Sequence, residues 1–489
     1  MKKIMILGAS ILQLPAIKKA KEMGLEVVVV DMNPDAVGFQ TEGIEKEIIS
    51  TIDIPEIVKA AKRHSIDGIM TLATDMPMRA VAAVAKEMNL IGISADTAVK
   101  ATNKAEMRKA LKKAGVPIPV FYKVSTKEEY LEAVGKIKEA GYRCIIKPAD
   151  NSGSRGIDLL KDYDSETVEK AYNYSKESSR SGDLMVEEYM EGPEVSVETL
   201  SVNGVCHVIQ ITDKLTTDAP YFVEMGHSQP SGHTEEIKKQ IAEVAIAANH
   251  AIGISNGPSH TEIKITKDGP KVVELGARLG GDNITTYLTP LSTGVDMVES
   301  CIRIALGETA DLEPKFHKAS AIRYFRVEQG VIRDIRGLEE ARKIPGVKQI
   351  YVVHGIGEKM NGIKSSGDRS GFVIAQADTA EVAVEICEKA RAALVRLLES
   401  ADLVDRVLVF PAFAVGAGLC APGVHPVGHA GRSVGVAVAQ FEFRVGALQR
   451  VHVLHVGLFL CEGGVQMKQI PCPHPRQFPA CDYIKTDHD

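Results

Sequence analysis

The sequence has few of the features that mark a membrane protein, a secreted protein or a nucleic-acid-binding protein. No apolar run approaches the roughly 20 residues of a membrane helix, and the opening MKKIMILGASILQLP lacks a small-residue cleavage site. Lys and Arg number 58 against 64 Asp and Glu, so the formal net charge is −6. Because a phosphate backbone requires clustered cations, we expect no polynucleotide partner and no membrane contact.

Cysteine is also scarce. There are eight cysteines in 489 residues, no C-x-x-C pair occurs, and Cys144, Cys206, Cys301 and Cys387 stand alone in the sequence. Isolated thiols are typical of a reducing compartment, which predicts a cytoplasmic protein. The composition, 45% hydrophobic and 25% charged, is that of a globular protein with more than one core.

Two common nucleotide-binding motifs are missing. The P-loop pattern G-x-x-x-x-G-K-[ST] does not occur, and GASILQLP has one glycine where a dinucleotide fingerprint has three. A nicotinamide oxidoreductase is therefore disfavoured. Gly8 and Asp31 are each better explained as ends of strands than as cofactor ligands.

The first 95 residues alternate strand and helix. KIMILGA, LEVVVVD and IDGIMTL are short apolar runs typical of buried strands, and PAIKKAKEMG, PEIVKAAKRHS and PMRAVAAVAKEMNL have helical spacing. This alternation predicts a parallel sheet covered by helices on both faces.

Two glutamates lie in a predicted strand pair. SHTEIKITKDGPKVVELGARLGGD predicts two strands joined by KDGP, with Glu262 in the first and Glu274 in the second. On one face of adjacent antiparallel strands their carboxylates would repel unless a cation lay between them. Mg²⁺ suits the gap, because it needs only one or two protein carboxylates when phosphates supply other ligands. Alternatively, both are solvated strand residues, but the following Arg278 favours a polyphosphate site.

The stretch KPADNSGSRGI supplies a second part of this site. It follows the apolar run CII and has almost no apolar side chain from residue 151 to residue 156. Backbone N–H groups of such a loop can surround phosphate oxygens, and Lys147 adds a charge. The acidic connector EEYMEGPE then offers partners for an adenine and a ribose. The ordered series, rather than any one residue, indicates a nucleotide site.

Residues 1 to about 400 resemble the ATP-grasp superfamily of carboxylate-amine ligases and carboxylases, with similarity to L-amino-acid ligases and to single-unit relatives of carbamoyl-phosphate synthase. The resemblance implies an α/β and α+β fold. It has a Rossmann-like pre-ATP-grasp domain (1–95), an ATP-grasp domain of two α+β lobes (96–310) and a small α+β C-terminal domain (311–400). In the last, SAIRYFRV and SGFVIAQAD predict strands, and TAEVAVEICEKARAALVRLLES predicts one long helix over 379–400.

The resemblance also implies which residues bind ATP. Lys104 and Lys147 match the lysines that contact the phosphates and adenine, and the 151–156 loop matches a segment that folds over the β- and γ-phosphates. Glu188, Tyr189 and Met190 match the hinge that reads adenine, with Glu187 as an alternative, and Glu194 matches the ribose acid. The implied ATP-binding set is Lys104, Lys147, Asn151, Ser152, Gly153, Ser154, Gly156, Glu187, Glu188, Tyr189, Met190 and Glu194.

Further roles follow from the same resemblance. Glu262 and Glu274 match the ligands of Mg²⁺, with Mn²⁺ as an alternative, and Arg278 matches the cation that faces the transferred phosphoryl group. Lys147 and Arg278 are the expected catalytic cations. DAPYFVEMGHSQPS resembles the substrate-side loop of L-amino-acid ligases, and ELGARLGGDNITTYL resembles the other end of that site. The implied substrate residues are Glu224, His227, Arg278, Gly280 and Gly281.

The sequence departs from the family pattern at one position. The second metal carboxylate is usually followed by Asn in E-x-N, whereas here Gly276 stands there. Two hypotheses remain: a second metal ion is held more loosely, or Asn283 replaces the missing amide.

The implied activity is ATP-dependent formation of an acyl phosphate from a small carboxylate, followed by attack of an amine. An amino-acid ligase that forms dipeptides is favoured. A carboxylase or purine-pathway ligase and a non-catalytic ATP-binding regulator are the alternatives, although the glutamate pair argues against the regulator. A homodimer is usual for the family. The small domain also holds Arg323 and Arg369, which we expect to be structural rather than substrate-binding.

The sequence changes character after Ser400. Residues 401–489 are rich in Gly, Val, His and Pro and contain four of the eight cysteines. The irregular spacing of Cys420, Cys461, Cys472 and Cys481 disfavours structural zinc. We expect an atypical, irregular tail, either disordered or an artefact of the reading frame, and we assign it no function.

Overall fold

A computed structural model describes residues 1–150, 156–219, 221–326, 329–399, 432–445 and 449–462, with side chains as far as Leu394. The chain divides into two units, Met1–Leu408 and Val409–Asp489. All the predicted site residues belong to the first unit. The mixed α/β and α+β fold class is confirmed.

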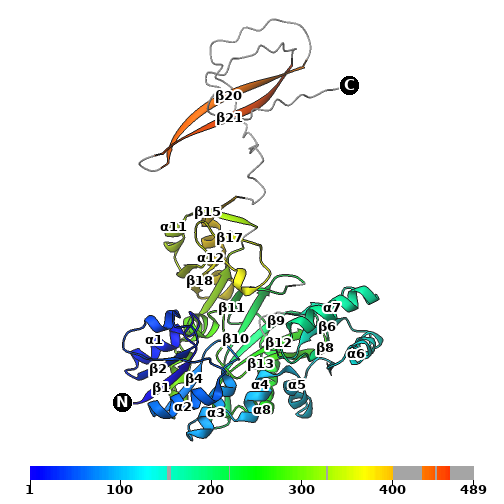
Figure 1. The fold of residues 1–489 in the computed structure, drawn as a ribbon, viewed down its shortest axis with the longest axis vertical. Helices are drawn as coiled ribbons and strands as arrows, with labels where there is room; N and C mark the ends of the chain where they lie inside the picture. The colour runs from blue at the N-terminus through cyan, green and yellow to red at the C-terminus, as the bar shows by residue number, and fades with distance from the viewer. Residues whose placement is uncertain (151–155, 220, 327–328, 400–431, 446–448, 463–489) are drawn as a thin grey trace. The chain divides into compact units, whose positions relative to one another are not determined.

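The N-terminal part has the predicted parallel sheet, in the order β3-β2-β1-β4 (Figure 1). Gly8 has a φ of +101°, and Asp31 accepts a hydrogen bond from the backbone N–H of Ala9 at 2.8 Å. Both residues therefore hold the ends of strands. The elements are β1 (Lys3–Leu7), α1 (Leu14–Glu22), β2 (Glu26–Asp31), η1 (Val37–Gln40), β3 (Glu45–Ile48), α2 (Ile54–His64), β4 (Gly68–Thr71) and α3 (Met78–Glu87).

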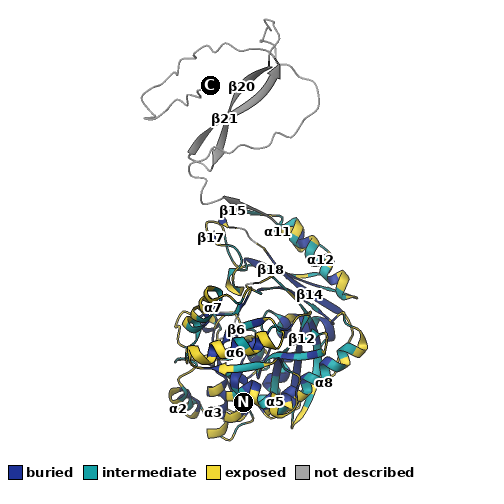
Figure 2. Ribbon diagram, turned by 90° about the vertical axis from the view of Figure 1, so that its right-hand side faces the viewer, coloured by how far each residue is buried: buried dark blue, intermediate teal, exposed yellow. Residues whose placement is uncertain are grey.

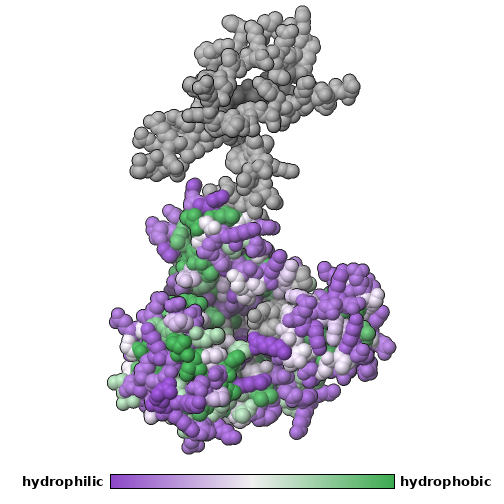
Figure 3. Space-filling view, viewed as in Figure 1, coloured by the Kyte–Doolittle hydropathy of each residue, from purple (hydrophilic) through white to green (hydrophobic). Residues whose placement is uncertain are grey.

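A smaller lobe follows, built on an antiparallel sheet in the order β5-β8-β6-β7. Two helices precede this sheet, and Asn103 lies between them. Its side chain accepts hydrogen bonds from the N–H groups of Ala105 and Glu106, so the second helix begins at Lys104. Hydrophilic side chains cover the outer face of α6 and α7 (Figure 3). The elements are α4 (Ala95–Thr102), α5 (Lys104–Lys113), β5 (Phe121–Val124), α6 (Lys127–Glu139), β6 (Cys144–Pro148), β7 (Asp158–Leu159), α7 (Ser165–Ser178) and β8 (Leu184–Glu188).

The large sheet has the order β13-β12-β9-β10-β11-β14-β18-β16. A turn at Asn203 and Gly204 joins its strands β9 and β10, with both residues at positive φ. Its strands are mostly buried, while the outer faces of α6 and α12 are exposed (Figure 2). The elements of its first half are β9 (Glu194–Val202), β10 (Val205–Thr216), β11 (Glu224–Gln229), α8 (Glu235–Ile252), β12 (Gly257–Thr266) and β13 (Gly269–Gly276).

The remaining strands of this sheet come from the predicted C-terminal domain, since β14 pairs with β11. Hydrogen bonding therefore continues across the boundary expected at residue 310. The elements are η2 (Ile284–Leu288), α9 (Thr289–Thr293), α10 (Met297–Ala305), β14 (Ala319–Tyr324), β15 (Gly330–Arg336), α11 (Leu338–Arg342), β16 (Val347–Val352), β17 (Lys359–Met360), η3 (Ser366–Asp368), β18 (Gly371–Ala377), α12 (Ala380–Ala393) and β19 (Val395–Glu399).

The long helix predicted over 379–400 is wrong in its last turns. The helix α12 ends at Ala393, and β19 follows at once. The reason is tertiary, because β19 pairs with β15 in an antiparallel ladder that runs from Val331 opposite Glu399 to Arg336 opposite Val395. Those backbone hydrogen bonds outweigh the helical spacing of the sequence.

The second unit contains one antiparallel strand pair, β20 (Arg432–Val445) with β21 (Gln449–Glu462). The prediction of an irregular tail is therefore wrong for these two segments. Cys420, Cys472 and Cys481 lie outside the described residues. Among the helices that are described, none has both the length and the apolarity to cross a lipid bilayer.

We expect a chain that ends at Leu408 to fold as the full-length chain does, because the first unit supplies its own sheets and cores. Its thermal midpoint, measured by differential scanning fluorimetry with and without MgATP, should match that of residues 1–489. A midpoint lower by about 5 °C, roughly 4 kcal/mol for a chain of about 400 residues, would show that the tail stabilises the first unit.

Candidate active site

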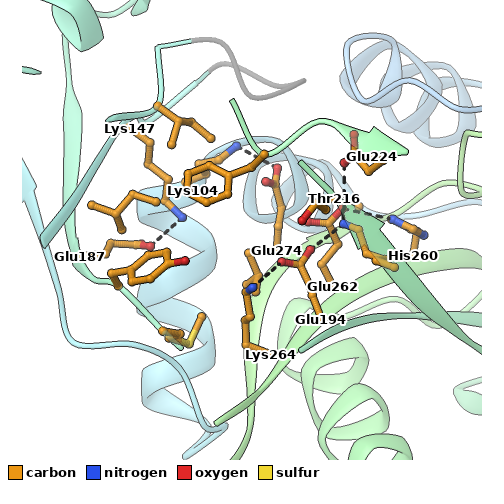
Figure 4. Close-up of a pocket in the computed structure, with 18 of the residues that line it drawn as sticks. Lys104, Lys147, Glu187, Glu194, Thr216, Glu224, His260, Glu262, Lys264 and Glu274 are labelled. Carbon is orange, nitrogen blue, oxygen red and sulfur yellow. Dashed lines mark hydrogen bonds and ion pairs between the residues drawn. The ribbon is translucent and has the colours of Figure 1, made fainter. Parts of the chain in front are cut away.

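The predicted ATP and metal residues converge on one cavity of about 210 Å³ between the two lobes (Figure 4). Of the predicted residues, those that line it are Lys104, Lys147, Glu187, Glu188, Tyr189, Met190, Glu194, Glu224, Glu262, Glu274 and Arg278. Gly156, His227, Gly280 and Gly281 are described but do not line it, and Asn151, Ser152, Gly153 and Ser154 lie outside the described residues.

Glu262 and Glu274 are directly opposite each other on β12 and β13, which confirms the predicted strand pairing. Both side chains reach the cavity, where each carboxylate contacts an ammonium group (Figure 4). Lys104 Nζ lies 2.8 Å from Glu274 Oε1, and Lys214 Nζ lies 3.0 Å from Glu262 Oε1. Two carboxylates side by side, neutralised by cations, are a donor set that fits Mg²⁺ with nucleotide phosphates. Their metal-binding role stays a prediction.

Lys214 on β10 is a residue that the sequence analysis missed. Its side chain is 3% exposed, and Nζ lies 2.6 Å from Glu194, 3.0 Å from Glu262 and 3.7 Å from Glu224. Burial alone would lower the pKa of Lys214, but the three carboxylates raise it well above its ordinary value. The Lys214 ammonium therefore contacts the predicted ribose acid Glu194, the predicted metal ligand Glu262 and Glu224 of the predicted substrate loop.

Lys147 belongs to a second buried ion network, in the small lobe. Its Nζ lies 2.6 Å from Glu187 Oε2, and Arg108 from α5 donates to the same carboxylate with a 2.8 Å Nε–Oε1 distance. Burial would raise the pKa of Glu187, but Arg108 and Lys147 lower it to about 2. The Glu187 side chain thus fixes Lys147 toward the cavity.

The predicted hinge residues Glu188, Tyr189 and Met190 line the part of the cavity that we call the adenine end, after their predicted role. Val120 N–H donates to Glu188 Oε2 at 3.0 Å, and Lys271 Nζ lies 3.1 Å from Glu188 Oε1. Tyr189 lies with its ring centroid 6.2 Å from that of Phe222. Apolar and aromatic walls of this kind suit a flat base.

Arg278 is held by the N-terminal domain. Its guanidinium binds Asp75 through Nε–Oδ1 and Nη2–Oδ2 distances of 2.9 and 3.2 Å. This pair accounts for the glycine at position 276. A Cβ there would lie 2.7 Å from Asp75 Oδ1 and 3.2 Å from the Arg278 guanidinium. The space that an E-x-N asparagine would need is already filled. Asn283 does not line the cavity, so its proposed substitution for that asparagine gains no support.

The buried His260 lies beside the Glu262–Glu274 pair, and the sequence analysis did not identify it. His260 Nδ1 lies 2.6 Å from Glu198 Oε1, and its Nε2 lies 3.6 Å from Glu262 Oε1. Burial would lower the pKa of His260, but Glu198 raises it to about 9. A Cβ on Gly280 would lie 2.8 Å from both partners of this pair. Gly280 therefore makes room for the pair.

We expect Glu187→Gln to destabilise the protein strongly, because it leaves Arg108 and Lys147 buried without their carboxylate. Breaking a buried pair costs about 3–5 kcal/mol, which thermal unfolding should report as a lower midpoint. The control is Glu169→Gln, whose exposed pair with Lys127 should matter little. Equal midpoints for the two variants would contradict the network.

The same pair predicts a pH dependence. The pKa of Glu187 is depressed to about 2, so its stabilising contribution is complete above its unfolded pKa near 4.5 and is lost as pH falls toward 2. The midpoint difference between parent and Glu187→Gln should shrink as the pH falls from about 5 to about 2.5. A difference that stays constant over this range would contradict it.

Gly276→Asn should destabilise the protein, because the new side chain enters the volume of Asp75. Overpacking of this kind costs about 1–3 kcal/mol. Combining it with Asp75→Ala should recover part of the loss, which a double-mutant cycle of thermal midpoints measures. Gly135→Asn is the control, since nothing lies near a Cβ there. Additive effects of the two changes would refute the steric explanation.

Comparison with known proteins agrees with this geometry. Residues 140–286 match the ATP-grasp domain, and residues 323–396 match the L-amino acid ligase C-terminal domain 2. The chain is 29% identical over 304 residues to alanine–anticapsin ligase of Bacillus subtilis, covering 57% of this chain and 62% of that protein. It is 26% identical over 408 residues to phosphoribosylamine–glycine ligase of Methanocaldococcus jannaschii, covering 77% and 89%.

The solved structure of L-amino acid ligase from Bacillus licheniformis shares the fold, with a TM-score of 0.70, 23% identity, and coverage of 82% of this chain and 99% of that one. The expected resemblance is thus confirmed for both the nucleotide-binding and the C-terminal parts. The chain contains an ATP-grasp domain and an L-amino acid ligase C-terminal domain, and it is an enzyme similar to ligases that form carbon–nitrogen bonds.

Proposed function

We propose that this enzyme activates an amino acid carboxylate with ATP and joins the acyl group to the amine of a second amino acid. The observation that carries the proposal is the convergence on one cavity of the Glu262–Glu274 pair with Lys104, Lys147 and Arg278. A ligand with several negative charges and a bound metal offers partners to both signs at once. MgATP is such a ligand.

The cations suit phosphoryl transfer. When bound between Glu262 and Glu274, Mg²⁺ would neutralise charge on the phosphates. Lys147 and Arg278 are positioned by Glu187 and Asp75, so both charges are in place before a substrate binds. Fixed charges stabilise a developing negative charge without reorganisation of the site.

The proposed reaction has two steps. A substrate carboxylate attacks the γ-phosphate, giving an acyl phosphate and ADP, and the amine then displaces phosphate and forms the amide. The protein needs no nucleophile of its own for either step. An acyl phosphate hydrolyses readily, so the site must exclude water during the reaction.

The amino-acid branch is favoured by the C-terminal match. Residues 323–396 match a domain named for L-amino acid ligases, and Arg369 within that range contacts the proposed substrate loop through the Glu224 carbonyl oxygen, 3.1 Å from Nη1. His227 on the same strand as Glu224 is 2% exposed and packs beside Asp282. We propose Glu224 and His227 as substrate residues.

A purine-pathway ligase is the second candidate. The similarity to phosphoribosylamine–glycine ligase covers 89% of that protein, more than the similarity to alanine–anticapsin ligase covers of its own. Glycine is also a small carboxylate, so the same cavity could serve this reaction. The two candidates differ in the amine that accepts the acyl group.

ADP and phosphate release should rise when MgATP is supplied with pairs of L-amino acids, and mass spectrometry should detect a dipeptide. Lys147→Ala and Glu274→Gln should each lower this turnover by at least about 100-fold, because each removes a charge that stabilises phosphoryl transfer. Turnover is measured with a coupled ADP assay.

Lys170→Ala and Glu235→Gln are matched controls, because both side chains are exposed and lie on outer helices. They should retain the parent rate. Turnover that requires phosphoribosylamine together with glycine, or that requires bicarbonate, and that does not occur with pairs of L-amino acids, would move the enzyme to another branch. Near-parent activity of Lys147→Ala would refute its role.

A further inference from the structure

The loop after Arg278 has an unusual backbone. Asp282 and Asn283 have φ values of +51° and +63°, in the left-handed region that few residues other than glycine adopt. Asp and Asn tolerate this conformation best, but two in succession need support from their surroundings. The support comes from the C-terminal domain.

Arg369, just after η3, binds this loop with its whole guanidinium. Nη1 and Nη2 each lie 2.7 Å from a carboxylate oxygen of Asp282, in a bidentate pair. Nη1 also donates to the carbonyl oxygen of Glu224 at 3.1 Å, and Nε donates to Ser366 O at 3.0 Å. One side chain therefore connects the Asp282 loop, β11 and its own loop.

Tyr324 on β14 completes the contact. The Arg369 guanidinium carbon lies 3.8 Å from the centre of its ring, and its hydroxyl donates to the backbone carbonyl of Asp282 at 3.2 Å. Tyr324 is 4% exposed, so the stacked guanidinium is shielded from water on that side. A second bond, from Ser366 Oγ to Glu224 Oε2 at 3.3 Å, attaches the same loop to the Glu224 side chain.

Asp282 passes the constraint on to His227. His227 Nε2 lies 3.2 Å from Asp282 Oδ2, whereas its Nδ1 is buried and has no hydrogen-bond partner within the described residues. Because an ionised Asp282 can only accept a hydrogen bond, His227 Nε2–H is the donor of this contact, and Nδ1 is the ring nitrogen that has no partner within the described residues. A buried imidazole nitrogen without a partner is a place where a donor group of a ligand can bind.

The electrostatics keep this arrangement fixed. Although burial disfavours its charged form, Arg369 and then His227 hold the pKa of Asp282 far below its ordinary value. Asp282 in turn raises the pKa of Arg369 against the effect of burial. Glu224 is the other acidic group that faces this arginine. Each member of the pair therefore stabilises the ionised form of the other.

We propose that Arg369 is a positioning residue of the substrate site. By binding Asp282 and the Glu224 backbone, it fixes the position of His227. The C-terminal domain thereby completes the end of the site that binds the amine substrate. This proposal rests on the proposed function for the identity of that substrate. It gives Arg369 a role beyond the structural one expected from the sequence.

A purely structural tie between domains predicts a different behaviour. It would affect stability and leave the affinity for substrates alone. A positioning role affects the amine substrate and spares ATP, because Arg369 contacts the substrate loop and none of the residues of the adenine end. The two roles can be separated by kinetics and by local hydrogen exchange.

The variants are Arg369→Lys, Arg369→Ala and Asp282→Asn, with Arg342→Ala as control. Lysine keeps the charge but loses the fork and the stacking. Arg342 lies in the same domain and pairs with Glu339 at the surface, with both side chains about half exposed or more. Each variant is the full chain, and each is first checked for an unchanged circular dichroism spectrum.

The first readout needs no substrate. Deuterium uptake at residues 224–229 and 282–288 should rise in Arg369→Lys and in Asp282→Asn and stay at the parent level in Arg342→Ala. Uptake unchanged in both segments would overturn the proposal. If the arginine variants do not fold, Asp282→Asn tests the same contact from the other side and can still overturn the proposal.

The second readout uses the amino-acid panel with MgATP. The KM for the amine-donating amino acid should rise about tenfold or more in Arg369→Lys, as expected when a reactant is misplaced by a fraction of an ångström, while the KM for ATP stays within about twofold. Equal changes in both KM values would show that Arg369 has only a structural role and would overturn the proposal. If no amino acid supports turnover in the parent, the proposed function fails, and hydrogen exchange alone decides the positioning role.

Discussion

The site depends on the balance between acidic and basic side chains that are buried together. Glu262 and Glu274 could not lie side by side on one face of a sheet without cations, and Lys214 and Lys104 supply them in the absence of a metal. In the small lobe, Glu187 does the same for Arg108 and Lys147. Each charge on one side of the cavity therefore fixes the position of an opposite charge. Loss of any one leaves a buried ion without its partner.

Much of the fold could be predicted because its signals are local. The alternation of apolar runs with helical segments predicts β1, β2 and β4 of the parallel sheet but not the charged strand β3, and the Asn203-Gly204 dipeptide is a local signal for the turn between β9 and β10. The glutamate pair belongs to the same class, since two strands joined by a short turn fix the register between Glu262 and Glu274. In these cases the interacting residues are near each other in the chain.

The partners of those residues could not be predicted in this way. Lys214 is 48 residues from Glu262, Asp75 is 203 residues from Arg278, and Arg369 is 87 residues from Asp282. Asp75 and Arg369 reach the site because separate domains pack together, whereas Lys214 reaches it because β10 and β12 flank β9 in one sheet. The end of α12 is a further example, because β19 forms through pairing with the distant β15 and not through its own sequence. Long-range contacts set these features, and a single sequence contains no local trace of them.

The large sheet limits how the protein can move. Four residue pairs join β11 to β14, and β14 in turn carries β18 and β16. Backbone hydrogen bonds thus join the C-terminal strands to the main sheet. These strands could not move away as a rigid body without breaking that pairing. The four-stranded sheet of the small lobe has no such ladder to it. Within the described residues, a movement of the small lobe relative to the large sheet would therefore break no strand pairing.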